Sequence, residues 1–571
     1  MSEIDAQFEK WHRNVDDSMR AELDELRQSP QSLQDAFYRE LSFGTAGLRG
    51  ILGAGPNRMN VYTVGKATQG FANYLNAHFS EPSVAIARDS RNGGEAFVKT
   101  CASVLAANGI KAYVYPEIEP TPALSFAVRH LGCAGGINIT ASHNPAQYNG
   151  YKAYGPDGCQ IASSAAAGIQ QSIDSLDCFD DVMRVDFDEA LAQGSISWIE
   201  QETLDSFIDA VAAQSVEGPD SHRDVNLKVV YTPLNGTGLK CVLKILERFG
   251  ITDVTVVPEQ RDPDGNFPTC PYPNPEIREA LQKGLELCDK VKPDLLLATD
   301  PDADRVGIAV PHQGSYQLLT GNEVGILLLD YLCAKRLERG ESLADKVAIT
   351  TIVSSLMPDA QAAAYGFEMR RVLTGFKYIG GQIAQLEQAG QVERFMFGFE
   401  ESYGYMSGAH VRDKDAVNAS MLICQMARWH KSQGRDLVDA MNALYDRYGF
   451  YLNRTVNVQY PGSEGAAKMA AIMEGLRDNP PQELAGHRVL KFADFEPGVE
   501  MPRVNGSADE AQMLPGANVV SFTLGDGVKV LIRPSGTEPK IKAYLFAKAA
   551  TREQALQMLD ELQEAAKALL D

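Results

Sequence analysis

Three aspartates alternate in the stretch "LLLATDPDADRVGIAV", where Asp300, Asp302 and Asp304 follow an apolar run typical of a buried strand. Ligands tend to bind at the carboxyl ends of strands in open α/β sheets. Three carboxylates ~4 Å apart repel one another by ~4 kcal/mol per pair at an effective dielectric constant of ~20. A divalent cation removes this repulsion, and all-oxygen ligands select Mg²⁺ or a similar hard ion. The spacing therefore predicts a metal site, and the alternative is a solvated acidic turn. An EF-hand calcium loop is excluded, because Arg305 and Pro311 stand where that loop needs Gly and Glu.

The stretch "LIRPSGTEPKIKAY" has groups that could bind a phosphate. Arg533 can hold a phosphate through two nitrogens, and the turn that follows adds hydroxyl and backbone N–H donors from Ser535, Gly536 and Thr537. The alternative is an ordinary Pro-Ser-Gly turn. No Walker-type phosphate loop is present, because the only Gly-Lys pair that could supply one, at 65–66, is followed by Ala and lacks the preceding glycine. The stretch "NGTG" at 235–238 is predicted to be a structural turn.

Two further segments have groups suited to a sugar phosphate. In "MFGFEESYGY", Glu400 and Ser402 follow an apolar strand, and such carboxylates can act as acid and base or accept hydrogen bonds from sugar hydroxyls. In "FGTAGLRG", Arg49 follows a Gly-rich run. The stretches "VLTGFKYIG" and "HVRDKDAV" add Thr374, Lys377, Arg412 and Lys414. Taken singly, each of these segments is equally typical of a solvated loop.

Ser142 lies in the stretch "TASHNPAQYNGYKAY", together with His143 and Lys152. A serine hydrolase would need the nucleophile elbow G-x-S-x-G, and the residues that flank Ser142 do not form one. A serine near a metal and phosphate-binding arginines fits a carrier of a phosphoryl group better. The alternative is that Ser-His-Asn-Pro simply forms a turn.

Composition limits the function classes. The chain has 571 residues and a net charge of -22, from 53 basic and 75 acidic residues, which argues against a nucleic-acid partner. The nine cysteines form no C-x-x-C pair, as is typical of reduced cytosolic thiols. The N-terminus lacks the apolar region of a signal peptide, and no apolar run approaches the ~20 residues of a membrane span. We therefore expect a soluble cytoplasmic protein without a membrane partner.

The order of apolar and helical segments predicts an α/β protein of four domains. Strand–loop–helix–strand units recur, for example "SVAIA" followed by "RDSRNGG", "EAFVKTCASVLAANG" and "IKAYVY". The last part instead predicts antiparallel strands, a hairpin turn at Gly525-Asp526-Gly527, and an amphipathic helix with Thr551 as N-cap. We expect a helical N-terminal extension (1–42), three similar α/β domains with mixed or parallel sheets (43–210, 211–320 and 321–455) and a C-terminal α+β domain (456–571).

Five motifs, in order along the chain, resemble those of the α-D-phosphohexomutase family. The stretch "TASHNPAQYNGYK" is similar to the phosphoserine loop, "DPDADR" to the metal loop and "GFEES" to the sugar-recognition loop. The stretch "RPSGTEPK" is similar to the phosphate-binding loop, and "FGTAGLRG" to the N-terminal substrate loop. The resemblance covers roughly residues 43 to 550. It implies a fold of four domains around a central cleft, which agrees with the four domains expected from the strand and helix pattern.

The resemblance implies a role for each site residue. Ser142 would carry the phosphoryl group and, with Asp300, Asp302 and Asp304, bind Mg²⁺. His143 and Lys152 would handle a proton or stabilise charge. Glu400 and Ser402 would hold sugar hydroxyls. Contacts with the phosphorylated sugar would come from Arg49, Arg305, Thr374 and Lys414, and the phosphate that does not react would be bound by Arg533, Ser535, Gly536 and Thr537.

The implied activity is that of a phosphoglucomutase, which interconverts glucose 1-phosphate and glucose 6-phosphate through a phosphoserine. Glucose 1,6-bisphosphate would be the intermediate and activator. The sugar loop lacks the histidine of enzymes with dual mannose and glucose specificity, and Ser402 favours a hexose over a pentose. Phosphomannomutase or phosphopentomutase activity, a metal-dependent phosphatase and a non-catalytic sugar-phosphate sensor are the alternatives. The expected partners are small sugar phosphates, and the expected state is a monomer or a homodimer.

Overall fold

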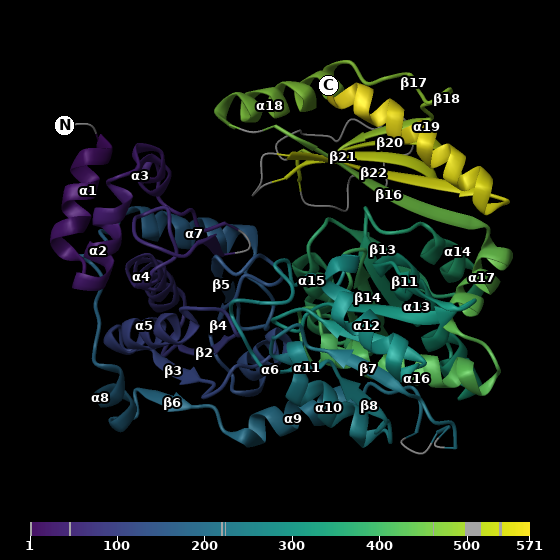
Figure 1. Cartoon of the computed structure of the whole chain (residues 1–571), viewed down its shortest axis with the longest axis horizontal. Coiled ribbons are helices and arrows are strands. Elements are labelled where there is room, and N and C mark those ends of the chain that lie inside the picture. Colours follow the sequence, from purple (N-terminus) through teal and green to yellow (C-terminus); the bar gives the residue numbers. More distant parts are fainter. Residues whose placement is uncertain are drawn as a thin grey trace. The chain divides into compact units, whose positions relative to one another are not determined.

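The apolar runs of the sequence form the strands of several sheets in the computed structural model of the chain (Figure 1). The structure describes residues 3–44, 47–218, 221–222, 224–460, 462–496, 516–535 and 540–571. The chain divides into two compact units. Unit 1 contains Met1–Gly321 and Ile379–Asp436, and unit 2 contains Asn322–Tyr378 and Leu437–Asp571.

The first sheet of unit 1 has six strands in the order β1-β5-β4-β2-β3-β6. Its strands are β1 (Leu48–Ile51), β2 (Ser83–Arg88), β3 (Lys111–Val114), β4 (Gly135–Ile139), β5 (Tyr148–Tyr154) and β6 (Ile196–Trp198). Strand β2 pairs in parallel with β3 and β4, whereas β5 runs antiparallel to β4. The central strands are buried along their length, which explains their apolar composition.

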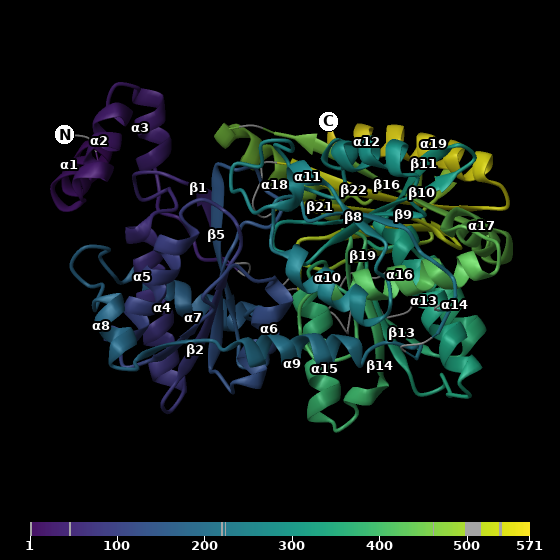
Figure 2. The same ribbon diagram turned by 60° about the horizontal axis from the view of Figure 1, so that its bottom comes forward.

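Helices cover this first sheet and connect its strands. They are α4 (Val61–His78), α5 (Gly94–Ala107), α6 (Thr121–His130), α7 (Ser163–Asp174), α8 (Phe187–Ala192) and α9 (Gln201–Ala212). Helices α4 and α5 lie side by side in both ribbon views (Figures 1 and 2). Their apolar residues join those of the strands in one core that includes Phe71, Val84 and Ile137.

Three short helices precede the first sheet, namely α1 (Glu3–Asn14), α2 (Asp17–Leu26) and α3 (Pro30–Phe37). Asp16 caps α2 and Ser29 caps α3 through their side-chain oxygens. Trp11 anchors the helices, because its ring makes edge contacts with the rings of Tyr62 and Phe179. These helices therefore pack on the body of unit 1.

The second sheet of unit 1 has five strands in the order β11-β10-β9-β7-β8. Its strands are β7 (Val229–Thr232), β8 (Val254–Val256), β9 (Leu295–Thr299), β10 (Val306–His312) and β11 (Ser315–Leu319). The helical segments between them are α10 (Gly238–Arg248), α11 (Pro258–Arg261), η1 (Arg278–Leu281) and α12 (Gln282–Val291). Strand β9 is parallel to β7 and antiparallel to β10, so the stretch 300–305 is a tight connection at the end of β9.

The second segment of unit 1 adds an antiparallel hairpin and a buried helix. Its elements are α15 (Phe376–Gln388), η2 (Val392–Arg394), β14 (Phe395–Glu400), β15 (Gly404–Ser407) and α16 (Ala416–Ser432). Strands β14 and β15 pair with each other, with Glu400 opposite Gly404 at the turn. Asp415 caps α16 by accepting from the backbone N–H groups of Val417 and Asn418.

Unit 2 contains a parallel strand pair and an antiparallel sheet. The pair is β12 (Val347–Thr351) and β13 (Glu368–Val372), and the nearby helices are α13 (Gly321–Glu338), α14 (Met357–Tyr365) and α17 (Leu437–Tyr448). The antiparallel sheet contains β16 (Phe450–Gln459), β19 (Lys491–Asp494), β20 (Val520–Gly525), β21 (Val528–Pro534) and β22 (Lys540–Ala549). The remaining elements are α18 (Gly462–Asp478), β17 (Glu483–Leu484), β18 (His487–Arg488) and α19 (Arg552–Leu570).

The details of this last sheet confirm the sequence prediction. The turn between β20 and β21 lies at Asp526 and Gly527, with Gly525 opposite Val528. Thr551 caps α19, which packs along β16 and β22 (Figure 1).

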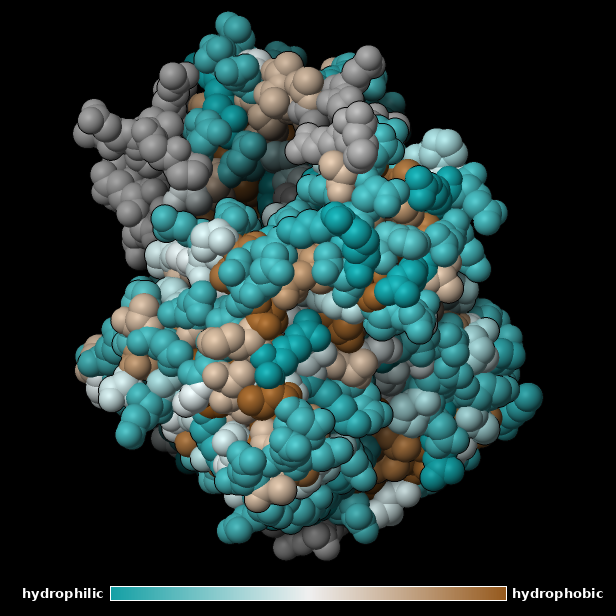
Figure 3. Space-filling model, turned by 90° about the vertical axis from the view of Figure 1, so that its left-hand side faces the viewer, coloured by the Kyte–Doolittle hydropathy of each residue, from teal (hydrophilic) through white to brown (hydrophobic). Residues whose placement is uncertain are grey.

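The predicted fold class, with α/β domains followed by a strand-rich C-terminal region, is confirmed. Within the described residues, every helix is too short or too polar to cross a membrane. On the face in Figure 3, apolar side chains lie in separate spots between hydrophilic ones.

Candidate active site

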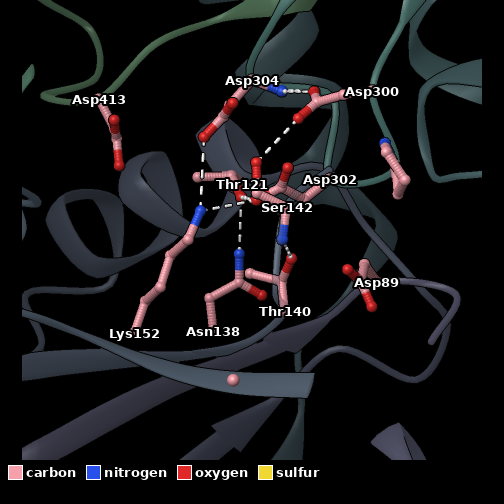
Figure 4. A network of polar contacts seen from close by, with 12 residues as sticks. Asp89, Thr121, Asn138, Thr140, Ser142, Lys152, Asp300, Asp302, Asp304 and Asp413 are labelled. Atoms are coloured by element: carbon pink, nitrogen blue, oxygen red, sulfur yellow. Dashed lines mark hydrogen bonds and ion pairs between the residues drawn. The ribbon is translucent and has the colours of Figure 1, made fainter. Parts of the chain in front are cut away.

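Three strands bring the predicted catalytic segments of unit 1 together. Ser142 follows β4, the aspartates follow β9, and Lys152 lies on β5. Figure 4 shows Ser142 below and to the left of the carboxylate of Asp300, with the Lys152 side chain extending toward Asp304. The sequence prediction that these residues share one site is therefore supported by their geometry.

Ser142 is held in an uncommon backbone conformation. Its φ is 52°, in the left-handed region that residues other than Gly rarely adopt. Its backbone N–H donates to Thr140 Oγ1 at 2.8 Å, and its side-chain Oγ donates to Asp300 Oδ2 at 3.0 Å. The Nδ1 atom of His143 lies 3.1 Å from the same Oγ. Ser142 is 4% exposed, so this hydroxyl is shielded from bulk water.

The three aspartates form a buried cluster of oxygen ligands. Asp300, Asp302 and Asp304 each have a carboxylate oxygen within 4.8 Å of the other two, and none is more than 1% exposed. Oδ1 of Asp302 and Oδ1 of Asp304 have no hydrogen-bond partner among the residues that the structure describes. Buried carboxylate oxygens without partners are costly unless a cation binds them. The donor set fits a hard divalent ion.

The charges of the cluster shift its pKa values in opposite directions. Burial raises the pKa of Asp300 well above its ordinary value, and the charges of Asp302 and Asp304 raise it further. Burial also raises the pKa of Asp302, but the charge and hydrogen bond of Lys152 outweigh it and hold this pKa below its ordinary value. Without a cation, the cluster therefore favours a proton on Asp300.

Two lysines balance part of this negative charge. Lys152 Nζ lies 2.7 Å from Asp302 Oδ2 and 3.4 Å from Asp304 Oδ2. Lys414 Nζ lies 3.1 Å from Asp304 Oδ2 and 3.1 Å from Asp413 Oδ1. Burial lowers the pKa of each lysine, but the neighbouring carboxylates outweigh burial and raise both pKa values. Both side chains are therefore cations at neutral pH.

Residues around the cluster fix its shape. Thr121 donates its hydroxyl to Asp302 Oδ2 at 2.9 Å and its backbone N–H to Asp302 O at 2.8 Å, and Asn138 donates to Thr121 Oγ1 (Figure 4). The turn predicted at "NGTG" supports the same loop. The backbone N–H of Thr237 donates to Pro301 O, and a Cβ atom at Gly236 would lie 2.3 Å from Pro301 Cα.

The predicted sugar-binding segment of unit 1 is joined to the metal loop. The backbone N–H of Val306 donates to Tyr403 O at 3.0 Å, and that of Ala416 donates to Ala303 O at 3.2 Å. Glu400 is buried at the end of β14, and Ser402 lies in the turn that follows.

The two predicted arginines of unit 1 border the site. Arg49, on β1, donates from Nη1 to Asn144 Oδ1 at 3.2 Å, so it contacts the loop that bears Ser142. Arg305 pairs with Glu276. Burial lowers the pKa of Arg305, but the carboxylates of Glu276 and Asp304 outweigh burial and raise it. Both side chains can therefore contribute positive charge beside the cluster.

The remaining predicted residues belong to unit 2. Thr374 follows β13, and its hydroxyl oxygen is buried without a hydrogen-bond partner among the described residues. Arg533 lies on β21 and Ser535 follows that strand, with its backbone N–H donating to Lys540 O at 2.8 Å. Gly536 and Thr537 lie outside the described residues.

Two supporting residues were not predicted from the sequence. Thr121 begins a helix and matches no motif, and Arg91 lies in the stretch "RDSRNGG", which was interpreted only as a loop. The one usable signal for Arg91 was its position three residues after β2, at the same sheet edge as Ser142, which is three residues after β4.

The chain matches three family models along most of its length. They describe the α/β/α domains I, II and III of phosphoglucomutase/phosphomannomutase and match residues 40–178, 205–314 and 320–448. The chain is also 36% identical over 521 residues to a phosphoglucomutase of Staphylococcus epidermidis, covering 91% of this chain and 92% of that protein. It is 36% identical over 558 residues to a phosphoglucomutase of Staphylococcus aureus, covering 97% of this chain and 98% of that protein.

Solved structures show the same fold at lower sequence identity. A phosphoglucomutase/phosphomannomutase family protein from Burkholderia thailandensis matches with a TM-score of 0.65 at 19% identity, covering 92% of this chain and 97% of that one. The phosphoglucomutase pp63/parafusin from Paramecium, in an open form, matches with a TM-score of 0.68 at 18% identity, covering 93% and 96%. The chain therefore belongs to the phosphoglucomutase/phosphomannomutase family of α-D-phosphohexomutases, and it is a mutase that moves a phosphoryl group within a sugar phosphate.

Proposed function

We propose that the chain is a phosphoglucomutase, which interconverts glucose 1-phosphate and glucose 6-phosphate through a phosphoserine at Ser142. The observation that carries this proposal is the 3.0 Å hydrogen bond from Ser142 Oγ to Asp300, inside a buried cluster of three aspartates. A serine in that position can exchange a phosphoryl group beside a cation. The names of the phosphoglucomutases that are 36% identical to this chain favour glucose as the sugar.

Mg²⁺ is the proposed metal, and Asp300, Asp302 and Asp304 would hold it together with an oxygen of the phosphorylated Ser142. Bound there, a divalent cation supplies positive charge that stabilises the phosphoryl group during transfer. Oδ1 of Asp302 and Oδ1 of Asp304 support this assignment, because neither has a hydrogen-bond donor among the described residues, although Arg305 Nε lies 3.8 Å from the latter.

Two phosphoryl transfers in opposite directions make up the proposed reaction. In the first, the bond between phosphorus and Ser142 Oγ breaks while a bond forms to the free hydroxyl oxygen of the sugar phosphate. The proton of that hydroxyl is released, and Ser142 Oγ takes up a proton. The product is glucose 1,6-bisphosphate, which turns around and returns its other phosphoryl group to Ser142. Added bisphosphate would therefore also activate an unphosphorylated enzyme.

His143 and Lys152 are suited to different parts of these steps. Burial lowers the pKa of His143 well below its ordinary value, and the charges of Arg305 and Arg49 lower it further, so its ring is neutral. A neutral Nδ1 atom 3.1 Å from Ser142 Oγ can take or return the hydroxyl proton. Lys152 is held as a cation by Asp302, and it fits stabilisation of the transferring charge.

The substrate contacts are proposed from the family resemblance. Glu400 and Ser402 would bind sugar hydroxyls, and contacts with the phosphorylated sugar would come from Arg49, Arg305, Thr374 and Lys414. The phosphate that does not react would be bound by Arg533, Ser535, Gly536 and Thr537. The proposed domains are 43–210, 211–320, 321–455 and 456–571, after the N-terminal extension 1–42. The protein is proposed to be cytoplasmic, and to be a monomer or a homodimer.

A coupled assay across sugar 1-phosphates tests the proposal. We expect glucose 1-phosphate to be converted faster than mannose, ribose or deoxyribose 1-phosphate, with activity that requires Mg²⁺ and rises with a trace of glucose 1,6-bisphosphate. The Ser142→Ala variant should be inactive with every substrate. A clear preference for a pentose phosphate would overturn the assignment of substrate, and full activity of Ser142→Ala would overturn the mechanism.

A further inference from the structure

The side chain of Arg91 is buried directly beneath the loop that bears Ser142. Its Nη1 atom donates to Pro145 O and Tyr148 O, both at 2.9 Å. Its Nη2 atom donates to Ser142 O at 2.6 Å and to Asn144 O. One guanidinium group therefore holds four backbone carbonyls between 142 and 148, and Arg91 is only 3% exposed.

An arginine is well suited to hold several carbonyls at once. The segment 142–147 connects β4 to β5, and its backbone makes few hydrogen bonds of its own: Gln147 O accepts from the backbone N–H of Leu52, and Pro145 O accepts from that of Tyr148. A buried carbonyl that loses its donor costs ~1–3 kcal/mol, so the loop depends on Arg91 most at Ser142 O and Asn144 O. An arginine provides five N–H donors in a rigid plane, whereas a lysine provides three on one flexible atom.

Arg91 is itself fixed from two sides. Its backbone N–H donates to Asp89 Oδ1 at 2.9 Å, and its Nε lies 3.4 Å from Asp89 Oδ2. The guanidinium also lies over the ring of Phe267, 5.1 Å from the centroid. Asp89 is close to Thr140, whose hydroxyl oxygen accepts from the backbone N–H of Ser142 (Figure 4).

These contacts act on a strained residue. A left-handed conformation at a residue other than Gly costs ~1–2 kcal/mol and persists only where its surroundings enforce it. Arg91 binds the carbonyl of Ser142, and Thr140 binds its N–H, so both neighbouring peptide groups are fixed. The direction of Oγ toward Asp300 follows from this fixed backbone.

We propose that Arg91 is a positioning residue for phosphoryl transfer, because its guanidinium holds the loop 142–148 in the conformation that directs Ser142 Oγ at the aspartate cluster. The proposal rests on the proposed role of Ser142 as the phosphoryl carrier. Arg91 binds the loop through backbone carbonyls, that of Ser142 included, and its side chain donates no hydrogen bond to the three aspartates or to Glu400 and Ser402. Its loss should therefore slow transfer without weakening sugar binding.

Arg428 provides a matched control for the cost of changing a buried arginine. It lies on α16, is 1% exposed, and donates from Nη1 to a backbone carbonyl, that of Phe249, at 2.9 Å. That carbonyl lies outside the loop 142–148. Arg428→Lys should thus show what changing a buried arginine bound to a carbonyl does to stability without affecting the loop 142–148.

The experiment compares Arg91→Lys with Arg428→Lys in the full chain. For Arg91→Lys we expect kcat to fall by ~10²-fold with KM for glucose 1-phosphate changed less than twofold, since a displacement of ~1 Å at a reacting atom can cost that much. Phosphorylation of Ser142 by glucose 1,6-bisphosphate should slow by the same factor. Hydrogen exchange of the backbone amides in 141–148 should speed up. Arg428→Lys should change none of these readouts by more than twofold.

A second variant keeps the proposal testable if Arg91→Lys does not fold. Asp89→Asn keeps the acceptor for the Arg91 backbone N–H but removes the charge that orients the guanidinium. It should change the same readouts in the same direction by less, with kcat lowered ~10-fold. If both Arg91→Lys and Asp89→Asn match Arg428→Lys in kcat and hydrogen exchange, the positioning role is wrong. If Ser142→Ala retains full activity, the proposed function fails instead, so the two failures are distinguishable.

Discussion

At the scale of single residues, the chemistry depends on the balance of charge around three buried aspartates. Lys152 and Lys414 form ion pairs that offset part of the negative charge of Asp302 and Asp304. Among the described residues, no lysine or arginine forms an ion pair with Asp300. The high pKa of Asp300 is the consequence, since burial and two neighbouring negative charges disfavour its ionised form. A cation at the cluster would relieve this penalty.

Mg²⁺ should therefore stabilise the folded protein through the aspartate cluster. At a concentration 100 times its Kd, a ligand that binds only the folded state adds ~2.7 kcal/mol. In a unit as large as unit 1, this corresponds to a rise of ~3 °C in the Tm. Differential scanning calorimetry with and without Mg²⁺ measures this rise. The Asp302→Asn variant should lose it, whereas Asp205→Asn, at an exposed surface pair with Lys244, should keep it. An equal rise in Asp302→Asn would contradict the metal assignment.

The buried carboxyl of Glu119, which is not one of the proposed metal ligands, should make the stability of the folded protein depend on pH. Its side chain is 3% exposed, and burial raises its pKa to about 7, although Lys240 at 3.3 Å opposes the shift. The folded state therefore keeps a proton between pH ~4.5 and ~7 that the unfolded chain has released, so stability falls as pH rises through this window. The loss at pH 8 is ~1–3 kcal/mol.

The Glu119→Gln variant should remove this loss. We expect its Tm to exceed that of the unchanged protein by a few degrees at pH 8 and by less at pH 5. Glu117→Gln is the control, since Glu117 also pairs with Lys240 but is largely exposed. A Tm difference that is the same at both pH values would show that the ionisation of Glu119 has no part in it.

At the scale of elements, the N-terminal helices support the segment that leads out of β1. Glu22 of α2 accepts from the backbone N–H of Ala54, and Ala36 O of α3 accepts from that of Asn57. Asp35 also pairs with Arg58. Strand β1 carries Arg49 and pairs with β5, the strand of Lys152, so the helices connect to the site through one strand.

Trp11 is one of the large buried side chains in this packing. It is 4% exposed, and Trp11→Ala should lower the local stability of α1–α3 by ~3–5 kcal/mol through the cavity left behind. Hydrogen exchange should then become faster in α1–α3 and in 53–58. Trp198→Ala, at a side chain that is 40% exposed, should leave exchange there unchanged. Unchanged exchange in Trp11→Ala would mean that the helices are held by other contacts.

At the scale of the whole molecule, the sequence predicted what local patterns encode. Apolar runs predicted the α/β sheets, and the alternation of Asp300, Asp302 and Asp304 predicted a cluster that the structure forms. The supporting contacts were not predictable, because Thr121 meets Asp302 across 181 positions of sequence and Arg91 binds backbone carbonyls, which leave no signature in side-chain types. The domain boundaries and the roles of Arg533 and Ser535 stay predictions.

Transfer of the phosphoryl group from Ser142 to the sugar tests the central claim most directly. The protein is labelled with ³²P from glucose 1,6-bisphosphate, freed of the label donor, mixed with unlabelled glucose 1-phosphate and Mg²⁺, and quenched at millisecond intervals. We predict that the label sits on the peptide containing Ser142 and passes to glucose bisphosphate at least as fast as kcat. Label that stays on the protein during turnover, or that leaves only as inorganic phosphate, would contradict the account.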